Sequence, residues 1–315
     1  MMFRPERRQS RFERTGDYRY GRMENAAVAS LRDEILAFYG LNIDHGWIDA
    51  GGVRTFYLSA GSGPPLVMLH GAGGGGVLWA PVVDALRRQF RIIIPDVIGY
   101  GESDKPKGPY DRLFFAGWFR GFMDAMGLNK ASLVGNSQGG AIAVQFAMDY
   151  PARVSCLALV CSAGLRPLRG IGWPAMVDMV RAQLFVSKRS MLRLVRHLVH
   201  DIRRFPLDSA VRYLEAVAAM PGGKRAFLEG RGRAVRPFSR MELDRVHCPT
   251  LILWGAEDRI IRPHTATKSV PAIADATVKL MTGAGHTPFI DRPGLFSEYL
   301  AEFILQRGKH ARLPG

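Results

Sequence analysis

The sequence predicts an α/β protein with an eight-stranded, mostly parallel sheet that is flanked by helices and interrupted by a helical insertion. Eight short apolar runs alternate with segments of helical character along most of the 315 residues, as in a parallel sheet covered by helices. Between residues 165 and 245 the alternation stops, and apolar residues recur every three or four positions, which is typical of helices. An apolar fraction of 47% allows one large core.

The expected elements follow one another without an internal repeat. The sheet opens with an antiparallel hairpin, residues 47–50 and 53–59, around Gly51-Gly52. Further strands are expected at residues 66–69, 91–95, 132–134, 154–160, 251–254 and 278–281, and helices at residues 77–88, 112–126 and directly after residue 137. Proline at position 206 and the Pro-Gly-Gly segment at 221–223 divide the insertion into separate helices.

These elements divide the chain into five parts. Residues 1–45 are expected to form an N-terminal arm, disordered in part, and a leading helix. Residues 46–164 and 246–306 form the two parts of the core, residues 165–245 a helical lid, and residues 307–315 a C-terminal tail. Catalytic groups of parallel sheets gather outside the carboxyl ends of the strands, so we expect the insertion to cover that edge.

One pentapeptide predicts a nucleophilic serine. Gly135, Asn136, Ser137, Gln138 and Gly139 spell Gly-x-Ser-x-Gly between an apolar strand run and a helix. A serine on such a tight turn projects its hydroxyl from the sheet edge, and only small residues fit two positions to either side. The helix that follows points its unpaired N–H groups at the place where an oxyanion develops during acyl transfer. Ser137 is therefore the expected nucleophile.

A serine hydroxyl needs a base that takes its proton and an acid that orients this base. Asp258 follows the run 251–254, and His286 follows the run 278–281 in a glycine-rich loop. Both are therefore expected at the carboxyl ends of strands, on the same edge as Ser137, and the order Ser, Asp, His is known from such folds. Glu257 is the competing acid, but aspartate is the commoner orienting residue in triads of this kind.

A second backbone donor for the oxyanion is expected from the glycine-rich turn at residues 70–76, which follows the run 66–69. The N–H groups of Ala72 and Gln138 are the predicted oxyanion hole. His70 is expected to brace this loop rather than to transfer protons.

The same glycine-rich turn has an alternative interpretation as a phosphate-binding loop. Gly71, Gly73 and Gly76 fit Gly-x-Gly-x-x-Gly, and Asp96 follows about twenty residues later. A loop so rich in glycine satisfies this fingerprint easily, and a dinucleotide site leaves the serine turn unexplained. We therefore expect no cofactor and no metal.

With these residues in place, the chain resembles the α/β-hydrolase family over nearly its whole length, about residues 46–303. The resemblance rests on His70-Gly71, on Asp96 with Gly-Tyr-Gly-Glu-Ser-Asp at 99–104, on the serine turn, on the Asp258 loop, and on Gly-His at 285–286 with Asp-Arg-Pro at 291–293. Within the family, the Gly-Asn-Ser-x-Gly-Gly turn is most similar to carbon–carbon bond hydrolases of aromatic meta-cleavage products and to their carboxylesterase relatives.

Two positions depart from the carbon–carbon hydrolases. These enzymes usually carry Asn where Gly101 stands, and Trp directly after the catalytic histidine, where this chain has Thr287. Both departures favour a general esterase. Haloalkane dehalogenases and epoxide hydrolases are similar overall but need a carboxylate nucleophile, which Ser137 excludes.

The net charge of +15 is unevenly distributed. Residues 165–245 contain 17 Lys and Arg against 7 Asp and Glu, a net charge of +10, and the first 22 residues carry +4. A basic lid is expected to steer anionic substrates or to contact an acidic surface such as membrane headgroups, or else only to keep the protein soluble. Nucleic acid is not an expected partner, because no binding module accompanies these charges.

The sequence predicts a cytoplasmic protein. The first 22 residues contain seven arginines but no apolar segment of a secretory signal, and no apolar run approaches the roughly 20 residues of a membrane span. Cys156, Cys161 and Cys248 form no closed disulfide framework and are expected to be free thiols. The expected partner is a small-molecule substrate, and the oligomeric state, monomer or homodimer, stays open.

Together these features predict a serine hydrolase that cleaves an ester of a small to medium, hydrophobic or carboxylated substrate through an acyl-enzyme on Ser137. One alternative is carbon–carbon bond hydrolysis of the meta-cleavage-product type by the same residues. The other is a non-catalytic ligand-binding protein, against which the presence of Ser, His and Asp together argues.

Overall fold

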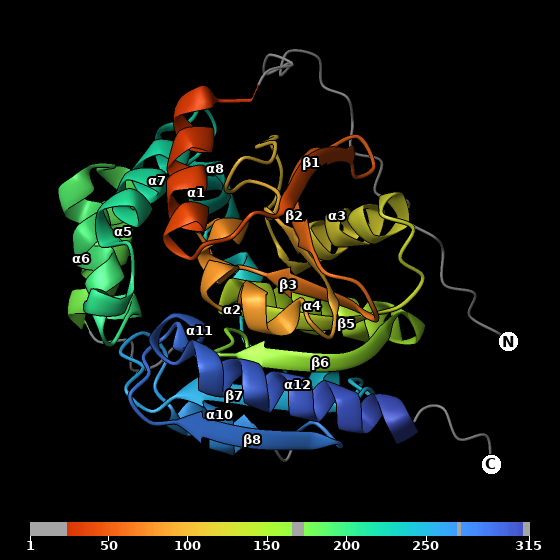
Figure 1. The fold of residues 1–315 in the computed structure, drawn as a ribbon. Helices are drawn as coiled ribbons and strands as arrows, with labels where there is room; N and C mark the ends of the chain where they lie inside the picture. Colours follow the sequence, from red (N-terminus) through yellow and green to blue (C-terminus); the bar gives the residue numbers. More distant parts are fainter. Residues whose placement is uncertain (1–23, 166–172, 270–271, 311–315) are drawn as a thin grey trace, which may run out of the picture.

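The protein is built on one eight-stranded sheet, seen in a computed structural model that describes residues 24–165, 173–269 and 272–310 (Figure 1). The strand order is β1-β2-β4-β3-β5-β6-β7-β8. β2 is antiparallel to both β1 and β4, and every other pair is parallel. The predicted fold class is confirmed. The strands are β1 (Asp44–Asp49), β2 (Arg54–Ala60), β3 (Pro65–Leu69), β4 (Arg91–Pro95), β5 (Ala131–Asn136), β6 (Val154–Val160), β7 (Thr250–Gly255) and β8 (Ala276–Met281).

Helices cover both faces of this sheet (Figure 1). Leu66 and Met68 of β3 face a core that includes α2 and α12, whereas Val67 and Leu69 face a second core that includes α3 and α4. Because both faces are buried, the central strands are apolar on both sides and read as continuous apolar runs in the sequence. The covering helices are α2 (Ala80–Leu86), α3 (Arg112–Ala125), α4 (Gln138–Asp149) and α12 (Pro293–His310).

The helix expected at residues 77–88 differs from the expectation at its start. It begins with a 3-10 turn, Gly76–Trp79, and becomes α-helical only at Ala80. In this tighter turn the N–H of Gly76 donates to Asp96 Oδ1 at 2.5 Å. The bond ties the end of the glycine-rich loop to the residue that follows β4, which periodicity within the helix does not predict.

Between β6 and β7 the described chain is helical and contains no strand. The helices are α5 (Trp173–Leu184), α6 (Lys188–Leu198), α7 (Leu207–Ala219), α8 (Arg225–Gly230) and α9 (Arg240–Leu243). Ser187 caps α6 by accepting the N–H of Ser190, and Pro206 directly precedes α7. Residues 166–172 of the expected lid lie outside the described residues. We refer to the described helices of this segment as the helical insertion.

The leading helix α1 (Ala26–Phe38) lies beside α7 (Figure 1). A buried ion pair joins α1 to the core, in which Arg32 Nη1 donates to both carboxylate oxygens of Glu102 at 2.9 and 3.0 Å. Burial raises the pKa of Glu102 to about 8, although Arg32 favours the ionised form. The helix therefore depends on a partner 70 positions away in the sequence.

The remaining helices, α10 (His264–Ser269) and α11 (Pro288–Asp291), are short. Within the described ranges, no helix combines the length and the apolar character that crossing a membrane requires.

Candidate active site

Ser137 lies on the turn between β5 and α4 with a φ of 53° and a ψ of −117°. A positive φ is unfavourable for a residue with a side chain and marks a turn that the surrounding structure holds in place. A Cβ atom on Gly135 would lie 2.4 Å from the carbonyl oxygen of Gly139, and one on Gly139 would lie 2.4 Å from that of Leu69. Close backbone contacts thus require glycine on both sides of the serine.

His286 and Asp258 form a buried pair. The distance between His286 Nδ1 and Asp258 Oδ2 is 2.9 Å, and the two side chains are 3% and 0% exposed. Asp258 Oδ1 accepts the N–H groups of Ile260 and Ile261 at 2.8 and 3.0 Å, which fixes the orientation of the carboxylate. A carboxylate at Nδ1 favours the tautomer with its proton on that atom and leaves Nε2 as the basic nitrogen.

The side chain of Asn136 connects this pair to the serine turn. Its Nδ2 donates to the carbonyl oxygens of His286 and Val160, both at 3.1 Å. Because Asn136 directly precedes Ser137, its bond to His286 holds the loop that follows β8, residues 282–286, beside the serine turn. We call this loop the histidine loop. The structure therefore brings Ser137, Asp258 and His286 to one edge of the sheet, beyond the carboxyl ends of β5, β7 and β8.

Glu257, the competing acid, bonds to the backbone instead. Its Oε2 accepts the N–H of Ala284 at 2.9 Å, and its own N–H donates to the carbonyl of Ala284 at 3.0 Å. These bonds brace the loop that leads from β8 to His286. They leave the imidazole contact to Asp258.

The glycine-rich loop after β3 passes against the serine turn. A Cβ atom on Gly71 would lie 3.2 Å from Ser137 Cβ. Gln138 is the first residue of α4, so its N–H has no acceptor within the helix, and its side-chain oxygen accepts the hydroxyl of Tyr100 at 3.1 Å. The assignment of the oxyanion hole to the N–H groups of Ala72 and Gln138 stays a prediction.

His70 holds this loop in place. Its Nδ1 lies 2.8 Å from the carbonyl oxygen of Gly71, and its Nε2 accepts the N–H of Val97 at 2.9 Å. These two bonds require a neutral ring with the proton on Nδ1. Burial lowers the pKa of His70, which keeps the ring in that form.

Asp291 stabilises the histidine loop, a role that the sequence did not predict. Its Oδ2 accepts the N–H of Gly285 at 2.8 Å, and its Oδ1 accepts those of His200 and Asp201 at 2.8 and 2.9 Å. One buried carboxylate therefore joins the histidine loop to the segment that follows α6. The Asp-Arg-Pro segment at 291–293 is the only available signal in the sequence, and it does not indicate which N–H groups the carboxylate meets.

Cys161 lies against the acid–imidazole pair. Its Sγ is within 4.8 Å of a carboxylate oxygen of Asp258 and a ring nitrogen of His286, the one group of metal-ligand type in the described residues. Burial raises the pKa of the thiol well above its usual value, which favours the neutral form of the sulfur. As predicted, Cys156, Cys161 and Cys248 are free thiols.

The helical insertion reaches the site on two sides. A Cβ atom on Gly73 would lie 2.9 Å from Gln183 Nε2 of α5, and one on Gly75 would overlap the hydroxyl of Tyr213 in α7. Thr287, directly after His286, donates its N–H and its hydroxyl to the carbonyl of Leu198, both at 3.2 Å. The insertion therefore borders both the glycine-rich loop and the histidine loop.

A mostly parallel sheet with a strained serine turn after β5 and a buried Asp–His pair after β7 and β8 defines a class, the α/β proteins with the layout of a hydrolase. A family model described as alpha/beta hydrolase fold matches residues 64–293. The chain belongs to the α/β hydrolase fold family.

The similar proteins include hydrolases of more than one kind. A 2-hydroxymuconate semialdehyde hydrolase of Pseudomonas sp. (strain CF600) is 31% identical over 270 residues, which cover 82% of this chain and 93% of that protein. The crystal structure of a membrane phospholipase A, described as a bacterial virulence factor, is 29% identical with a TM-score of 0.76, covering 89% of this chain and 91% of the other. A serine hydrolase involved in carbazole degradation is 26% identical with a TM-score of 0.74, covering 84% and 100%.

Proposed function

We propose that this protein is a serine hydrolase that cleaves an ester of a small to medium, hydrophobic or carboxylated substrate through an acyl-enzyme on Ser137. One observation carries the proposal. Ser137 is held at a φ of 53°, and the residue before it is hydrogen-bonded to His286, whose ring is bonded to the buried Asp258. This combination supports the assignment of a nucleophile, a base and an orienting acid to one sheet edge.

In the first step, Ser137 Oγ attacks the ester carbonyl while its proton moves to His286 Nε2. The carbon–oxygen bond then breaks, and the alcohol leaves with that proton. In the second step, His286 takes a proton from water, whose oxygen attacks the acyl carbon, and the acid leaves as the proton returns to Ser137. Asp258 stabilises the imidazolium in both steps, and the N–H groups of Gln138 and Ala72 donate to the oxyanion.

Gly101 supports ester cleavage over carbon–carbon cleavage. The carbon–carbon hydrolases usually carry asparagine at this position, but here φ is 52° and a Cβ atom would overlap the carboxylate of Asp96. Asp96 accepts the N–H groups of Gly76 and Glu102 at 2.5 and 2.6 Å and would lose these bonds by moving away. An asparagine side chain therefore does not fit this backbone. At Thr287, where those enzymes carry tryptophan, the hydroxyl is engaged by the insertion.

The helical insertion is proposed to act as a lid that selects the substrate. Two contacts support this role. Gln183 of α5 and Tyr213 of α7 approach the glycine-rich loop after β3. On the other side, the carbonyl of Leu198 accepts the hydroxyl of Thr287, next to His286. Substrate-selecting groups placed on both sides of a nucleophile can exclude water as well as position the acyl group.

The experiment is turnover of a series of p-nitrophenyl esters by the parent protein and by Ser137→Ala. We expect a loss of several powers of ten in kcat for the variant, with unchanged circular dichroism. Ser162→Ala is the matched control, because Ser162 is buried beside the same turn and its hydroxyl donates to the carbonyl of Ala163. A serine-directed fluorophosphonate should label Ser137 alone.

The outcomes separate the three functions. Near-normal ester turnover by Ser137→Ala would contradict the assignment of the nucleophile. Turnover of a meta-cleavage dienoate without turnover of any ester would establish carbon–carbon hydrolysis. Ligand binding without turnover of either substrate would establish the non-catalytic alternative.

A further inference from the structure

The helical insertion exposes apolar side chains in a row. Met176, Val180 and Leu184 follow one another at intervals of four residues on α5, so they lie on one side of the helix. Each is more than a third exposed, and Phe185, directly after the helix, is 71% exposed. Ala175 and Ala182, on the opposite side, are buried. Large apolar side chains in a contiguous, exposed row are uncommon on a protein that contacts only water.

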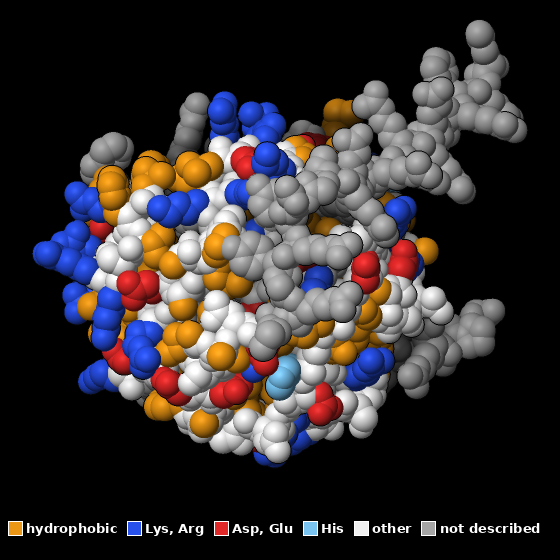
Figure 2. Space-filling view, turned by 90° about the horizontal axis from the view of Figure 1, so that it is seen from above, with side chains coloured by type: hydrophobic (Ala, Val, Ile, Leu, Met, Phe, Trp, Pro, Cys, Tyr) orange, Lys and Arg blue, Asp and Glu red, His pale blue; other side chains and the backbone are white. Residues whose placement is uncertain are grey.

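The neighbouring helix α6 carries three arginines on the side away from its buried residues. Arg189, Arg193 and Arg196 recur at intervals of four and three residues, opposite the buried Met191 and Val195. Within the part of the chain that the structure describes, these three arginines have no ion-pair partner. Figure 2 shows Lys and Arg side chains gathered with hydrophobic ones at the left edge of the molecule, where Figure 1 places the insertion.

Other basic residues of the same helices are already neutralised. Lys188 pairs with Asp208 at 2.5 Å, and Arg181 lies 3.7 Å from Asp178. The unpaired charge is therefore concentrated on the three arginines of α6. We call Val180, Leu184, Phe185, Arg189, Arg193 and Arg196 the α5–α6 face.

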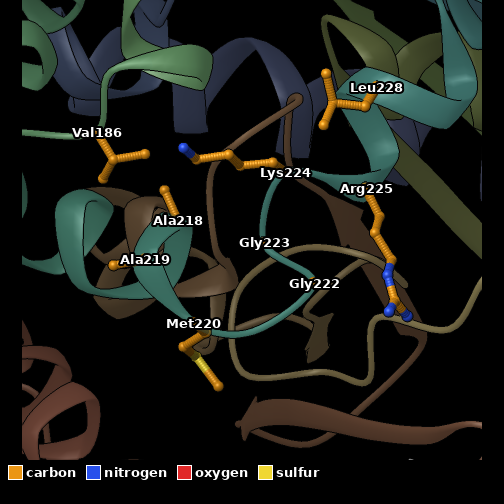
Figure 3. Close-up of a pocket in the computed structure, with 9 residues that line it drawn as sticks. All are labelled: Val186, Ala218, Ala219, Met220, Gly222, Gly223, Lys224, Arg225 and Leu228. Atoms are coloured by element: carbon orange, nitrogen blue, oxygen red, sulfur yellow. The ribbon is translucent and has the colours of Figure 1, made fainter.

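A pocket opens beside this face. Its volume is about 490 Å³, and the side chains that line it include Val186, Ala218, Met220 and Leu228, of which Leu228 is half exposed. Figure 3 shows the ammonium group of Lys224 extending toward Val186 across the pocket. This group donates to the carbonyl of Leu184 at 2.9 Å, which places the end of α5 at the rim.

The face also lies close to the candidate active site. Gln183, directly before Leu184, approaches the glycine-rich loop so closely that a Cβ atom on Gly73 would lie 2.9 Å from its Nε2. A surface that contacts Leu184 therefore lies within one helical turn of Gln183, which borders the site.

We infer that the α5–α6 face docks the protein on an anionic phospholipid bilayer, with Leu184 and Phe185 in the interface and the three arginines among the headgroups. An apolar row flanked by arginines is complementary to the acyl boundary and the negative surface of such a bilayer. A second copy of the chain is a poorer occupant, because a twofold contact would bring the same unpaired arginines of both copies together. The inference goes beyond the proposed function and does not depend on the reaction at Ser137.

The test is vesicle flotation with the full chain carrying Ser137→Ala, so that lipid hydrolysis does not interfere. The vesicles consist of phosphatidylcholine alone or of phosphatidylcholine with phosphatidylglycerol. We expect binding to the anionic vesicles, weaker at high salt, and a loss of about tenfold or more with Arg189→Glu plus Arg193→Glu, because each basic residue near such a surface contributes about 1 kcal/mol. Leu184→Asp plus Phe185→Asp should lower binding by a similar factor.

Matched controls lie on other surfaces. Leu113→Asp changes a 67% exposed side chain of α3. Lys130→Glu plus Lys279→Glu reverses two exposed charges, one directly before the central strand β5 and one on the edge strand β8. Both controls should bind like the parent. Equal losses in controls and face variants would overturn the inference, as would binding that survives all the face variants and so comes from the basic residues 1–23. Self-association without lipid that the face variants abolish would also overturn it, since the face would then be an interface between copies.

Discussion

Replacing Asp258 by asparagine tests the orientation of the imidazole in atomic detail. In the protein, Asp258 Oδ1 accepts two backbone N–H groups, those of Ile260 and Ile261, and Oδ2 faces His286 Nδ1. An asparagine has one oxygen and one NH₂ group for these two places. With its NH₂ group toward Ile260 and Ile261, two buried N–H donors would lose their acceptor, at about 1–3 kcal/mol each. The amide oxygen therefore stays at the Oδ1 position.

This orientation determines what the imidazole does. The NH₂ group of the introduced asparagine would face His286 Nδ1, which must then accept a hydrogen bond, so the ring proton moves to Nε2. A ring protonated at Nε2 cannot take the proton of Ser137. We expect kcat to fall by roughly ten-thousandfold, as for the same replacement in serine proteases, which corresponds to about 5.4 kcal/mol of barrier.

The assay is burst and steady-state turnover of a p-nitrophenyl ester, with unfolding in urea to show that the variant is folded. Glu257→Gln is the matched control, because the glutamine oxygen can still accept the N–H of Ala284 that Glu257 accepts now. We expect this control to lie within about threefold of the parent, since it keeps the bond. A large loss in Glu257→Gln together with a small one in Asp258→Asn would refute the assignment of the acid.

Three further predictions concern stability and charge. Gly101→Ala should lower the free energy of unfolding by about 2 kcal/mol more than Gly127→Ala, because both glycines have positive φ but only the Cβ atom at position 101 would overlap Asp96. Equal losses in urea unfolding would contradict the clash. Burial raises the folded-state pKa of Glu102 to about 8, so the contribution of this group to stability falls as pH rises toward that value, and Arg32→Met should extend the fall to higher pH. The loss from Arg32→Met should reach about 3 kcal/mol where Glu102 is ionised, and a loss that does not grow with pH would count against the buried pair. Rising salt should lower kcat/KM for a carboxylated ester and leave a neutral ester of matched shape nearly unchanged, because the basic insertion attracts anions through a field screened within about 10 Å at 0.1 M salt. Equal salt responses for the two esters would remove the steering role.

The sheet could be predicted from the sequence because its strands are buried on both faces. The expected strands at residues 91–95 and 154–160 agree with β4 and β6 to the residue. The order of strands could not be predicted, since β4 lies between β2 and β3 and only tertiary packing decides this exchange. The 3-10 start of the helix after Gly76 depends on a bond to Asp96, twenty residues away, which local periodicity does not contain.

The candidate site could be predicted where one local motif constrains the backbone. The glycines beside Ser137 are required by contacts within or next to the same turn, so the pentapeptide alone carries the signal. Asp258 and Glu257 are neighbours of similar chemistry, and only the turn around Ile260 decides which carboxylate faces the ring. The contacts of Arg32 with Glu102 depend on elements far apart in the sequence, so no local pattern indicates them.

The position of the proposed base depends on residues that do not take part in the reaction. Asn136 holds the carbonyl of His286, and Asp291 holds the N–H of Gly285, so two buried side chains fix the histidine loop from opposite ends of one dipeptide. Asp291 also accepts two N–H groups in the segment that follows α6, which means that the base and the insertion share one anchor. If α6 were displaced, for example when the α5–α6 face meets a surface, Asp291 would either move with it or lose its hydrogen bonds on one side. The insertion and the proposed base are therefore linked by hydrogen bonds to one carboxylate, that of Asp291.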